Sequence, residues 1–500
     1  MKRNLLDKVI EAFSPQSAAK RYYFRFQLDK VRRFEAASKG RRTDGWRTPS
    51  TDANGAFLGL LQTMRNRSRD LVRNNPYAQR AVQVISTNTV GKGIKGEAKV
   101  SGNKTKADRF QAEWENWAET TEIDADGKHN FYGLQRLAMR CVAESGSVII
   151  RKRRRRFTDG RTAPLQIQIL EPDFIDTSKE GKSGSNVIIQ GREFSSTGKP
   201  VAYWLFEEHP GNSLGFGSFK SVRVPASEII YMYRSDRIGQ IHGIPWGVSA
   251  FIRLKDFDDY EDAQLLRQKI AACFTAFVYD STGADNLTGL DSASNSGNDN
   301  GLADKFEPGM IEFLPSGKDI RIANPPAVSN YGEYTSAMLH SIAIAYNVPY
   351  EALTNDYSKT NYSSSRATWL QFHKDLDEWQ EIMLIPQMCN GIFDWFKQAL
   401  SLTGQDTKGV GITWIPPRRH LIDPTKEIPA IIKQIRSGLM SHKRALRELG
   451  FTPDEIYEEI KQSNEIFDEN NLTLDSDPRK VTGGGSLQKE EENSNEKEPE

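Results

Sequence analysis

Apolar residues recur most regularly between residues 363 and 400, and their spacing predicts one long helix. The stripe repeats every three or four residues, which places its members on one helical face: Trp369, Phe372, Leu376, Trp379 and Met383. The hydroxyls of Ser363 and Ser364 are suited to cap the first turn. Pro386 lacks a backbone N–H, but apolar residues resume after it. We therefore expect Pro386 to kink the helix rather than end it.

A polar segment, residues 355–362, comes directly before this helix. It contains Tyr357, Lys359, Asn361 and Tyr362, whose side chains are suited to polar contacts with a ligand. The pattern predicts a polar loop mounted on a long helix. From these residues alone, an ordinary surface loop on a core helix is the favoured interpretation, and a ligand-contacting loop is the alternative.

The centre of the chain combines two helices with a small β unit. Periodic apolar positions predict helices at 249–272 and 331–346. Between these helices, residues 273–279, 311–314 and 319–322 have strand-like patterns. Two helices are therefore expected to bracket a compact β insertion.

The first half of the chain alternates predicted helices and strands. Asn75 and Pro76 are expected to separate two helices. The glycines between 91 and 96 are assigned to a turn, because no helix begins there, as dinucleotide binding would require. Strand-like segments follow at 147–156, 165–169, 187–190, 200–206 and 222–233. This mixture predicts the α+β class.

The C-terminal part is predicted to be helical. Residues 414–417 are expected to form a linker, and three helices follow it. The third begins at an expected capping box, with Thr452 as the cap and Glu455 as its partner. Because this helix is acidic, a DNA-reading helix-turn-helix is disfavoured here.

Composition limits the kinds of function that the chain supports. Its 500 residues suffice for roughly three domains. The 67 Lys and Arg nearly balance 66 Asp and Glu, whereas domains that hold nucleic acid tightly are usually strongly basic. Any DNA contact is therefore expected to be local or weak. The three cysteines are scattered, so we expect no zinc site, disulfide framework or cofactor. We also expect no signal peptide and no membrane span.

Two charged clusters are the candidate sites for chemistry. One lies on the helix predicted at 249–272 and consists of Asp256, Asp258, Asp259, Glu261 and Asp262. Because consecutive helix positions point in different directions, a solvated acidic face is favoured over a metal site. The other cluster ends the strand predicted at 147–156 and contains Arg151, Arg153, Arg154, Arg155 and Arg156. A solvated or subunit-contact face is favoured over nucleic-acid binding for this arginine run.

Several segments, taken in order, resemble the lambda-type portal proteins of tailed bacteriophages. The resemblance covers roughly residues 60–460. It rests on 69–76 (Arg-Asp-Leu-Val-Arg-Asn-Asn-Pro), 130–135 (Asn-Phe-Tyr-Gly-Leu-Gln), 239–246 (Gly-Gln-Ile-His-Gly-Ile-Pro-Trp), 256–262 with 269–272, and 361–366 (Asn-Tyr-Ser-Ser-Ser-Arg). No single segment is diagnostic, but their order and spacing make the match specific.

This resemblance implies a portal fold, no cofactor, and a twelve-fold ring at one capsid vertex through which double-stranded DNA passes without sequence specificity. The implied partners are further copies of the chain, the terminase large subunit, the head–tail connector or adaptor, and capsid and scaffold proteins. The implied location is the virion, with the cytoplasm of the bacterial host as the place of assembly.

The resemblance also implies a division of the chain. The expected parts are a mixed α/β wing (51–248), a first stem helix (249–273), a clip (274–329) and a second stem helix (330–347). They continue with a wing return and the tunnel loop (348–364), a long kinked helix and linker (365–422), and a helical crown (423–475). A basic N-terminal arm (1–50) and a disordered acidic tail (476–500) lie outside the resemblance. Tyr357, Lys359, Asn361 and Tyr362 then belong to the tunnel loop.

Three functional hypotheses stand side by side. The leading one is a structural DNA conduit, because sliding DNA requires few fixed Lys and Arg contacts, and the balanced charge and acidic stem suit a channel of low grip. The second is a magnesium-dependent nuclease that uses the carboxylates of 256–262. The third is a DNA-binding regulator that uses the C-terminal helices, which the balanced charge disfavours.

Overall fold

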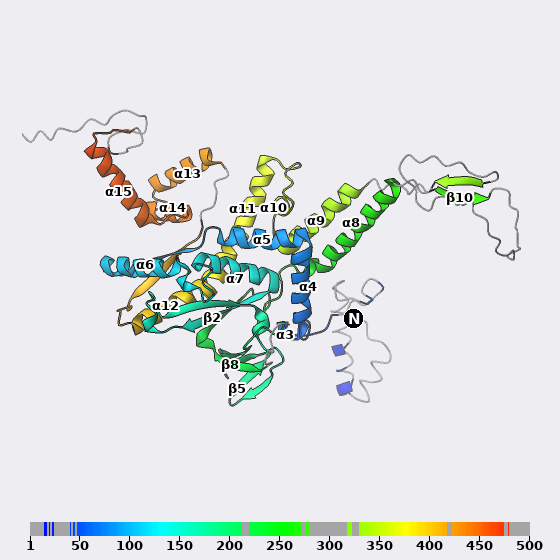
Figure 1. Ribbon diagram of the computed structural model, residues 1–500, viewed down its shortest axis with the longest axis horizontal. Helices are drawn as coiled ribbons and strands as arrows, with labels where there is room; N and C mark the ends of the chain where they lie inside the picture. Colours follow the sequence, from blue (N-terminus) through cyan, green and yellow to red (C-terminus); the bar gives the residue numbers. More distant parts are fainter. Residues whose placement is uncertain are drawn as a thin grey trace, which may run out of the picture. The chain divides into compact units, whose positions relative to one another are not determined.

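The computed structural model describes residues 48–212, 220–272, 330–417 and 423–474, with short pieces at 15–17, 20, 23–24, 41, 44–45, 276–280, 318–322 and 479. The chain divides into two units, Met1–Ala56 and Phe57–Glu500. Helix α3 (Ala53–Ala56) belongs to the first unit, and every element named below belongs to the second (Figure 1). Most of the predicted basic arm lies outside the described residues.

Four helices form the first part of the second unit: α4 (Leu61–Asn74), α5 (Pro76–Val90), α6 (Lys104–Ala118) and α7 (Phe131–Ser145). The predicted break at Asn75 and Pro76 is confirmed. The Asn75 side chain accepts the backbone N–H groups of Tyr77 and Ala78, each at 3.0 Å, and Pro76 occupies the first helical position. Asn75 therefore caps α5 where α4 ends.

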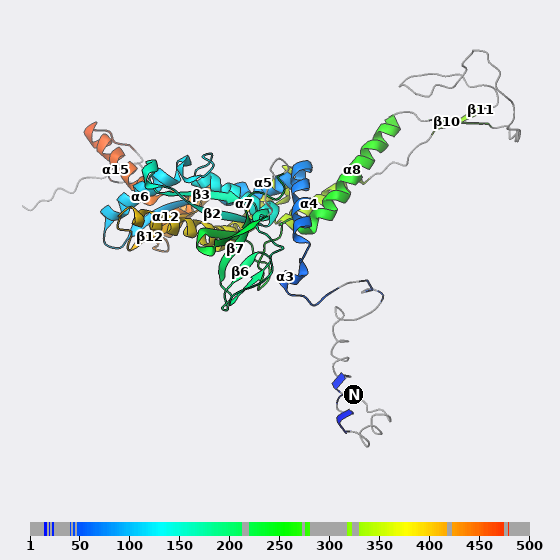
Figure 2. The ribbon, with the colours of Figure 1, turned by 60° about the horizontal axis from the view of Figure 1, so that its bottom comes forward.

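Three antiparallel sheets accompany these helices. β1 (Lys95–Val100) pairs with β12 (Val410–Ile415). A three-stranded sheet has the order β3-β2-β9, with β2 at Ser147–Arg154, β3 at Leu165–Leu170 and β9 at Ile229–Tyr233. A five-stranded sheet (Figure 2) runs β4 (Gly181–Ser183), β5 (Asn186–Ile189), β6 (Arg192–Phe194), β7 (Pro200–Phe206) and β8 (Ser221–Pro225).

The structure corrects one strand prediction and the linker prediction. The segment predicted at 222–233 is two strands, because a 3-10 turn at Ala226–Glu228 separates β8 from β9 and sends them into different sheets. The linker predicted at 414–417 begins instead inside β12, where Trp414 pairs with Gly96. A Cβ on Gly96 would lie 2.4 Å from Ile412 and 2.9 Å from the Trp414 ring, so a larger residue here would force these side chains to move.

The main hydrophobic core gathers aromatic rings from several elements. Trp114 and Trp117 are both fully buried. Trp117 stacks on Phe396 at 4.8 Å between ring centroids, and Trp114 meets Phe131 edge-to-face at 5.3 Å. The Trp117 indole N–H donates to the Leu165 carbonyl at 3.1 Å. The rings come from residues that precede β3 in the sequence and from one that follows it, and they pack into one core.

The predicted long helix is confirmed as three successive segments. These are α11 (Tyr362–Glu378), a π-helical stretch at Trp379–Cys389, and α12 (Asn390–Leu402). Pro386 lies inside the π-helical stretch, and the helix continues past it as expected. The predicted caps were wrong. Asn361 is the cap, and Ser364 completes a capping box with it, because the Asn361 side chain reaches the Ser364 N–H at 2.9 Å.

Two further helices flank a pair of strands in the sequence. Helices α8 (Phe251–Ala272) and α9 (Tyr331–Tyr346) match the predicted ranges closely. They lie side by side (Figure 1), and Tyr260 of α8 contacts both Tyr331 and Tyr334 of α9. Between them in the sequence, β10 (Ala276–Asp280) pairs antiparallel with β11 (Lys318–Ile322). The strand predicted at 311–314 lies outside the described residues.

The C-terminal part contains the three predicted helices, α13 (Pro424–Arg436), α14 (His442–Glu448) and α15 (Pro453–Glu469). The predicted capping box at α15 is not formed, since Thr452 occupies the cap position without a side-chain hydrogen bond to the helix. The arrangement of the described residues confirms the α+β class. Within those residues, no helix is both long and apolar enough to span a bilayer.

Asn75 provides a test of how α5 and α8 are connected. Besides capping α5, its amide donates to the Asp258 carboxylate of α8 at 2.6 Å. We expect Asn75→Ala to lower the free energy of unfolding by about 1–2 kcal/mol, because an N-cap and one hydrogen bond are lost. Urea denaturation followed by circular dichroism measures the change. The exposed neighbour is the control: Asn74→Ala should cost less than about 0.5 kcal/mol. Equal effects would contradict the cap assignment.

Candidate functional site

The polar loop at 355–361 is held in shape by its own hydrogen bonds. It joins the short helix α10 (Tyr350–Thr354) to α11. The Asp356 N–H donates to the Thr354 hydroxyl at 3.1 Å, and the Ser358 N–H donates to the Asp356 carboxylate at 3.0 Å. Hydrogen bonds from the side chain and then the backbone of Ser358 hold the pKa of Asp356 below its usual range. The loop is therefore a structured turn rather than a loose connection.

The side chains predicted for this loop do not all face outward in the same way. Tyr357 and Tyr362 are half exposed, at 50% each, and Lys359 is exposed. Asn361 is used differently, because its side-chain oxygen caps α11. Tyr357, Lys359 and Tyr362 thus remain available to a large ligand, while Asn361 fixes the end of the loop.

Two neighbouring elements anchor the loop. At its start, Arg80 of α5 donates to the Ala352 carbonyl at 3.0 Å and to the Asn355 side-chain oxygen at 3.1 Å. At its end, Lys426 of α13 lies 5.9 Å from the centroid of the Tyr362 ring. The sequence analysis missed Arg80, since 275 positions separate it from Asn355 and no local pattern connects them.

The five carboxylates of α8 have different surroundings. Asp258 accepts a hydrogen bond from Asn75 at 2.6 Å, and Asp259 pairs with Lys255 at 2.8 Å. Partial burial raises the pKa of Asp258 and of Glu261, although Asn75 and Tyr331 oppose this shift through hydrogen bonds. Asp256 and Asp262 are exposed. Among the described residues these carboxylates do not converge on one point, and the nuclease hypothesis has no support.

Much of the arginine run is bonded within its own subunit. Arg153 and Arg155 donate to the side-chain oxygens of Gln168 and Gln166 on β3, at 2.8 and 2.6 Å. Arg154 pairs with Glu228 at 2.9 Å. Arg156 is exposed and Arg151 is half-buried. The sheet therefore spreads the run over several local partners rather than presenting one continuous cationic face.

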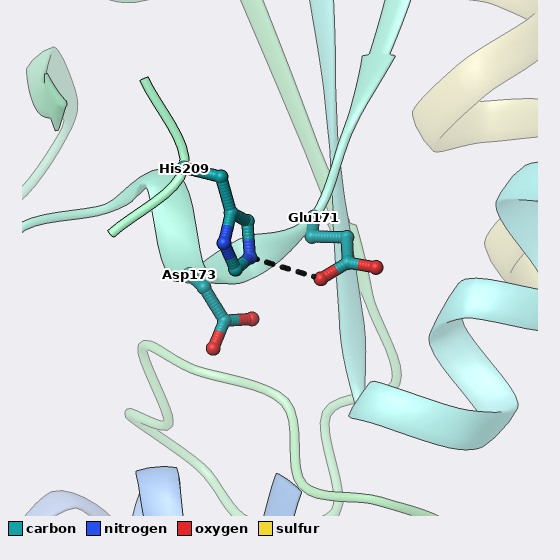
Figure 3. Close-up of side chains that lie close together, drawn as sticks. All are labelled: Glu171, Asp173 and His209. Atoms are coloured by element: carbon teal, nitrogen blue, oxygen red, sulfur yellow. Dashed lines mark hydrogen bonds and ion pairs between the residues drawn. The ribbon is translucent and has the colours of Figure 1, made fainter. Parts of the chain in front are cut away.

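A third charged cluster, which was not predicted from the sequence, lies near α4. Glu171, Asp173 and His209 place their ligand-type atoms within 4.8 Å of one another (Figure 3), the arrangement of a possible metal site. A side chain, Arg69 of α4, supplies the positive charge beside these carboxylates. It pairs with Asp173 and, at 3.1 Å, with Glu171. Burial alone would raise the pKa of Asp173, but the hydrogen bonds and charge of Arg69 lower it to about 2. We interpret the cluster as a structural network of ion pairs.

The segment 239–246 also has a structural explanation. His242 is fully buried, where its ring contacts the Tyr231 hydroxyl at 2.7 Å and the Gln190 carbonyl at 3.1 Å. Burial lowers the pKa of His242 well below its usual value, so the ring is neutral near pH 7. Trp246 packs on Trp379 of the long helix at 4.8 Å between ring centroids. This segment therefore ties the three-stranded sheet to the long helix.

The geometry and the ordered segments agree with one family. The family model described as phage portal protein, lambda family, matches residues 39–380, which is more than half of the chain. The chain belongs to this family. As a portal protein, it has the α+β fold that the resemblance implied.

Individual relatives agree with this family. The probable portal protein of Halomonas phage phiHAP-1 is 24% identical over 462 residues, covering 87% of this chain and 87% of the relative. Portal protein B of Escherichia phage lambda is 21% identical over 474 residues, covering 85% of this chain and 88% of the relative. The conclusion about family rests on the family model, and each of these relatives covers 85% or more of the chain.

Two solved structures have limited similarity to this chain. A chain in the virion of a native gene transfer agent particle covers 78% of this chain, with 94% of its own length aligned, 14% identity and a TM-score of 0.45. An HK97 family phage portal protein from Corynebacterium diphtheriae covers 72% of this chain and 98% of its own, with 12% identity and a TM-score of 0.32.

Proposed function

We propose that copies of this portal protein form a ring at one vertex of a phage capsid and that viral double-stranded DNA passes through it during packaging and ejection. The observation that carries the proposal is the family match over residues 39–380. The formal net charge of +1 at pH 7 suits this role, because a channel with few excess cations does not hold sliding phosphates firmly. The role is structural and requires no catalytic group.

The loop at 355–361 is the part that we propose to meet DNA, as the tunnel loop. Its exposed Tyr357 and Lys359 offer one aromatic edge and one cation per subunit, repeated around the ring. Such contacts reach the phosphate backbone and carry no sequence information. Arg80 and Asn361 hold the two ends of the loop on α5 and α11, so its position is fixed by rigid elements.

The remaining assignments follow the same proposal. Helices α8 and α9 correspond to the paired stem, β10 and β11 to the clip, and α13 to α15 to the crown. We propose that the clip meets the terminase motor and later the head–tail connector. We also propose that the virion is the place of the assembled ring and the host cytoplasm the place of its assembly, with capsid and scaffold proteins as further partners.

The arginine run is proposed to contribute to the contact between subunits. The Nε atom of Arg151 is buried and has no hydrogen-bond partner among the described residues, and Arg156 is exposed at the end of β2. A ring needs two different surfaces per subunit, so Arg151 and Arg156 would face an acidic surface of the next copy. The acidic face of α8 is the candidate for that opposite surface.

Lys359→Ser tests the tunnel loop. We expect rings to assemble normally and the yield of DNA-filled heads to fall, because every subunit loses the one cation of the loop that would guide the passing phosphate backbone. Negative-stain microscopy counts the rings, and nuclease-protected DNA per capsid measures filling. Lys374→Ser removes an equally exposed lysine from α11 and is the matched control.

The two parts of the proposal fail differently in this experiment. If the Lys359→Ser and Lys374→Ser proteins fill heads equally well, the loop is not the DNA contact, although the ring still stands. If the unmodified protein stays monomeric and never enters particles, the ring itself is rejected. The mass of the purified assembly, measured by native mass spectrometry, gives the copy number.

A further inference from the structure

Helix α13 leaves an apolar row uncovered. None of its residues is buried within the subunit. Ile428 and Ile432 lie one turn apart and are 46% and 44% exposed, and Leu439, in the turn that follows the helix, is 80% exposed. An amphipathic helix normally buries such a row against another element. The outward side of α13 is therefore a surface without a partner in the described part of its own subunit.

Helix α15 leaves a second such surface. Pro453 is its one buried residue. Ile466 is 54% exposed, and Ile460, on another side of the helix, is 47% exposed. Helix α14 contacts both α13 and α15, and His442 of α14 stacks on Tyr457 at 5.6 Å between ring centroids. These contacts leave Ile428 and Ile432 of α13 and Ile466 of α15 exposed.

The charges beside the two surfaces are opposite. On α13, the exposed Lys433 and Arg436 border the row, since Arg436 lies one turn beyond Ile432. On α15, the exposed Glu455 and Glu459 share a face with Ile466, at spacings of four and seven residues. Apolar centres with charged borders of opposite sign are typical of two surfaces that dock onto each other.

We propose that α15 of one subunit packs on α13 of the neighbouring subunit, and that this contact helps to close the ring. The proposal rests on the ring assembly proposed above and adds the surfaces that join adjacent crowns. Each copy offers one basic and one acidic surface, so the contact is heterologous and uses both surfaces of every subunit once the ring closes. A second copy is the occupant that supplies both the apolar area and the opposite charge.

Charge reversal on either side tests this contact. One variant carries Glu455→Lys and Glu459→Lys, and the other carries Lys433→Glu and Arg436→Glu. We expect each variant alone to form rings roughly tenfold less efficiently, because like charges then face each other at every contact. Co-expression of the two variants should restore rings, since alternating copies pair opposite charges. Light scattering after size exclusion measures the ring fraction, and circular dichroism checks that each variant is folded.

A control uses another face of the same helix. Glu458→Lys with Glu465→Lys makes the same charge change at exposed positions about a quarter-turn around α15 from Glu455 and Glu459. Both side chains pair with the exposed Lys461, at 3.8 and 4.0 Å, so circular dichroism must show that this variant is folded. We expect this variant to form rings as the unmodified protein does. Equal losses for both α15 variants would overturn the proposal, because net charge rather than the contact would then set assembly.

The remaining outcomes separate the possible errors. If the four substitutions in one chain restore rings but co-expression of the two variants does not, α15 docks on α13 of its own subunit and the proposal is wrong. If both variants form rings normally, the crown surfaces serve another partner. If the unmodified protein forms no ring, the proposed function fails before the crown contact is tested.

Discussion

Gly243→Ala should destabilise the portal protein by at least about 3 kcal/mol, because the added methyl group has no space. A Cβ on Gly243 would lie 1.9 Å from the Gly146 carbonyl oxygen and 2.6 Å from the Tyr233 Cβ. The closest obstacle is backbone, so a rotamer change cannot relieve the clash. Gly146 cannot withdraw easily either, since it ends α7 with a left-handed φ of 86°.

The measurement is the midpoint of urea denaturation, followed by far-ultraviolet circular dichroism, together with the yield of soluble protein. Gly332→Ala is the matched control, because a Cβ at that exposed position of α9 meets nothing within 4 Å. We expect this control to be neutral or slightly stabilising, since alanine favours a helix over glycine. If Gly243→Ala unfolds at the same urea concentration as Gly332→Ala, the backbone contact between Gly243 and Gly146 is not present.

Arg69→Ala should cost about 3–5 kcal/mol at neutral pH, because it leaves a buried carboxylate without its partner. The Asp173 side chain is 2% exposed and pairs directly with Arg69. Arg67→Ala, at an exposed position of the same helix, is the control and should cost less than about 0.5 kcal/mol. Replacing both partners, with Arg69→Met and Asp173→Leu, should recover much of the loss.

The pH dependence gives this prediction a second readout. In the unmodified protein, the pKa of Asp173 falls from its usual 3.8 to about 2. Its contribution to stability is therefore complete above about pH 4 and is lost as the pH falls toward about 2. Without Arg69, burial instead raises the pKa of Asp173, so protonation stabilises the variant as the pH drops. The cost of Arg69→Ala should consequently shrink between pH 7 and pH 4, and a constant cost would contradict the ion pair.

Local patterns explain why much of the secondary structure was predictable. The long helix, α8, α9 and the break at Asn75 all depend on residues within one or two turns of each other. Apolar periodicity and a capping side chain record such relations directly in the sequence. The wrong cap of α11 shows the limit, because Asn361, Ser363 and Ser364 all have suitable side chains. Backbone geometry selected Asn361 and placed Ser364 at the third helical position.

The sequence by itself determined the helical periods, the balanced charge and the ordered segments that place the chain in the portal family. Tertiary structure alone decided that β12 pairs with β1, that Arg80 holds the loop at 355–361 and that Arg69 neutralises Asp173. The physical reason is distance along the chain: these contacts join residues more than 100 positions apart. No local spacing encodes such partners, because they meet only when the whole core has packed.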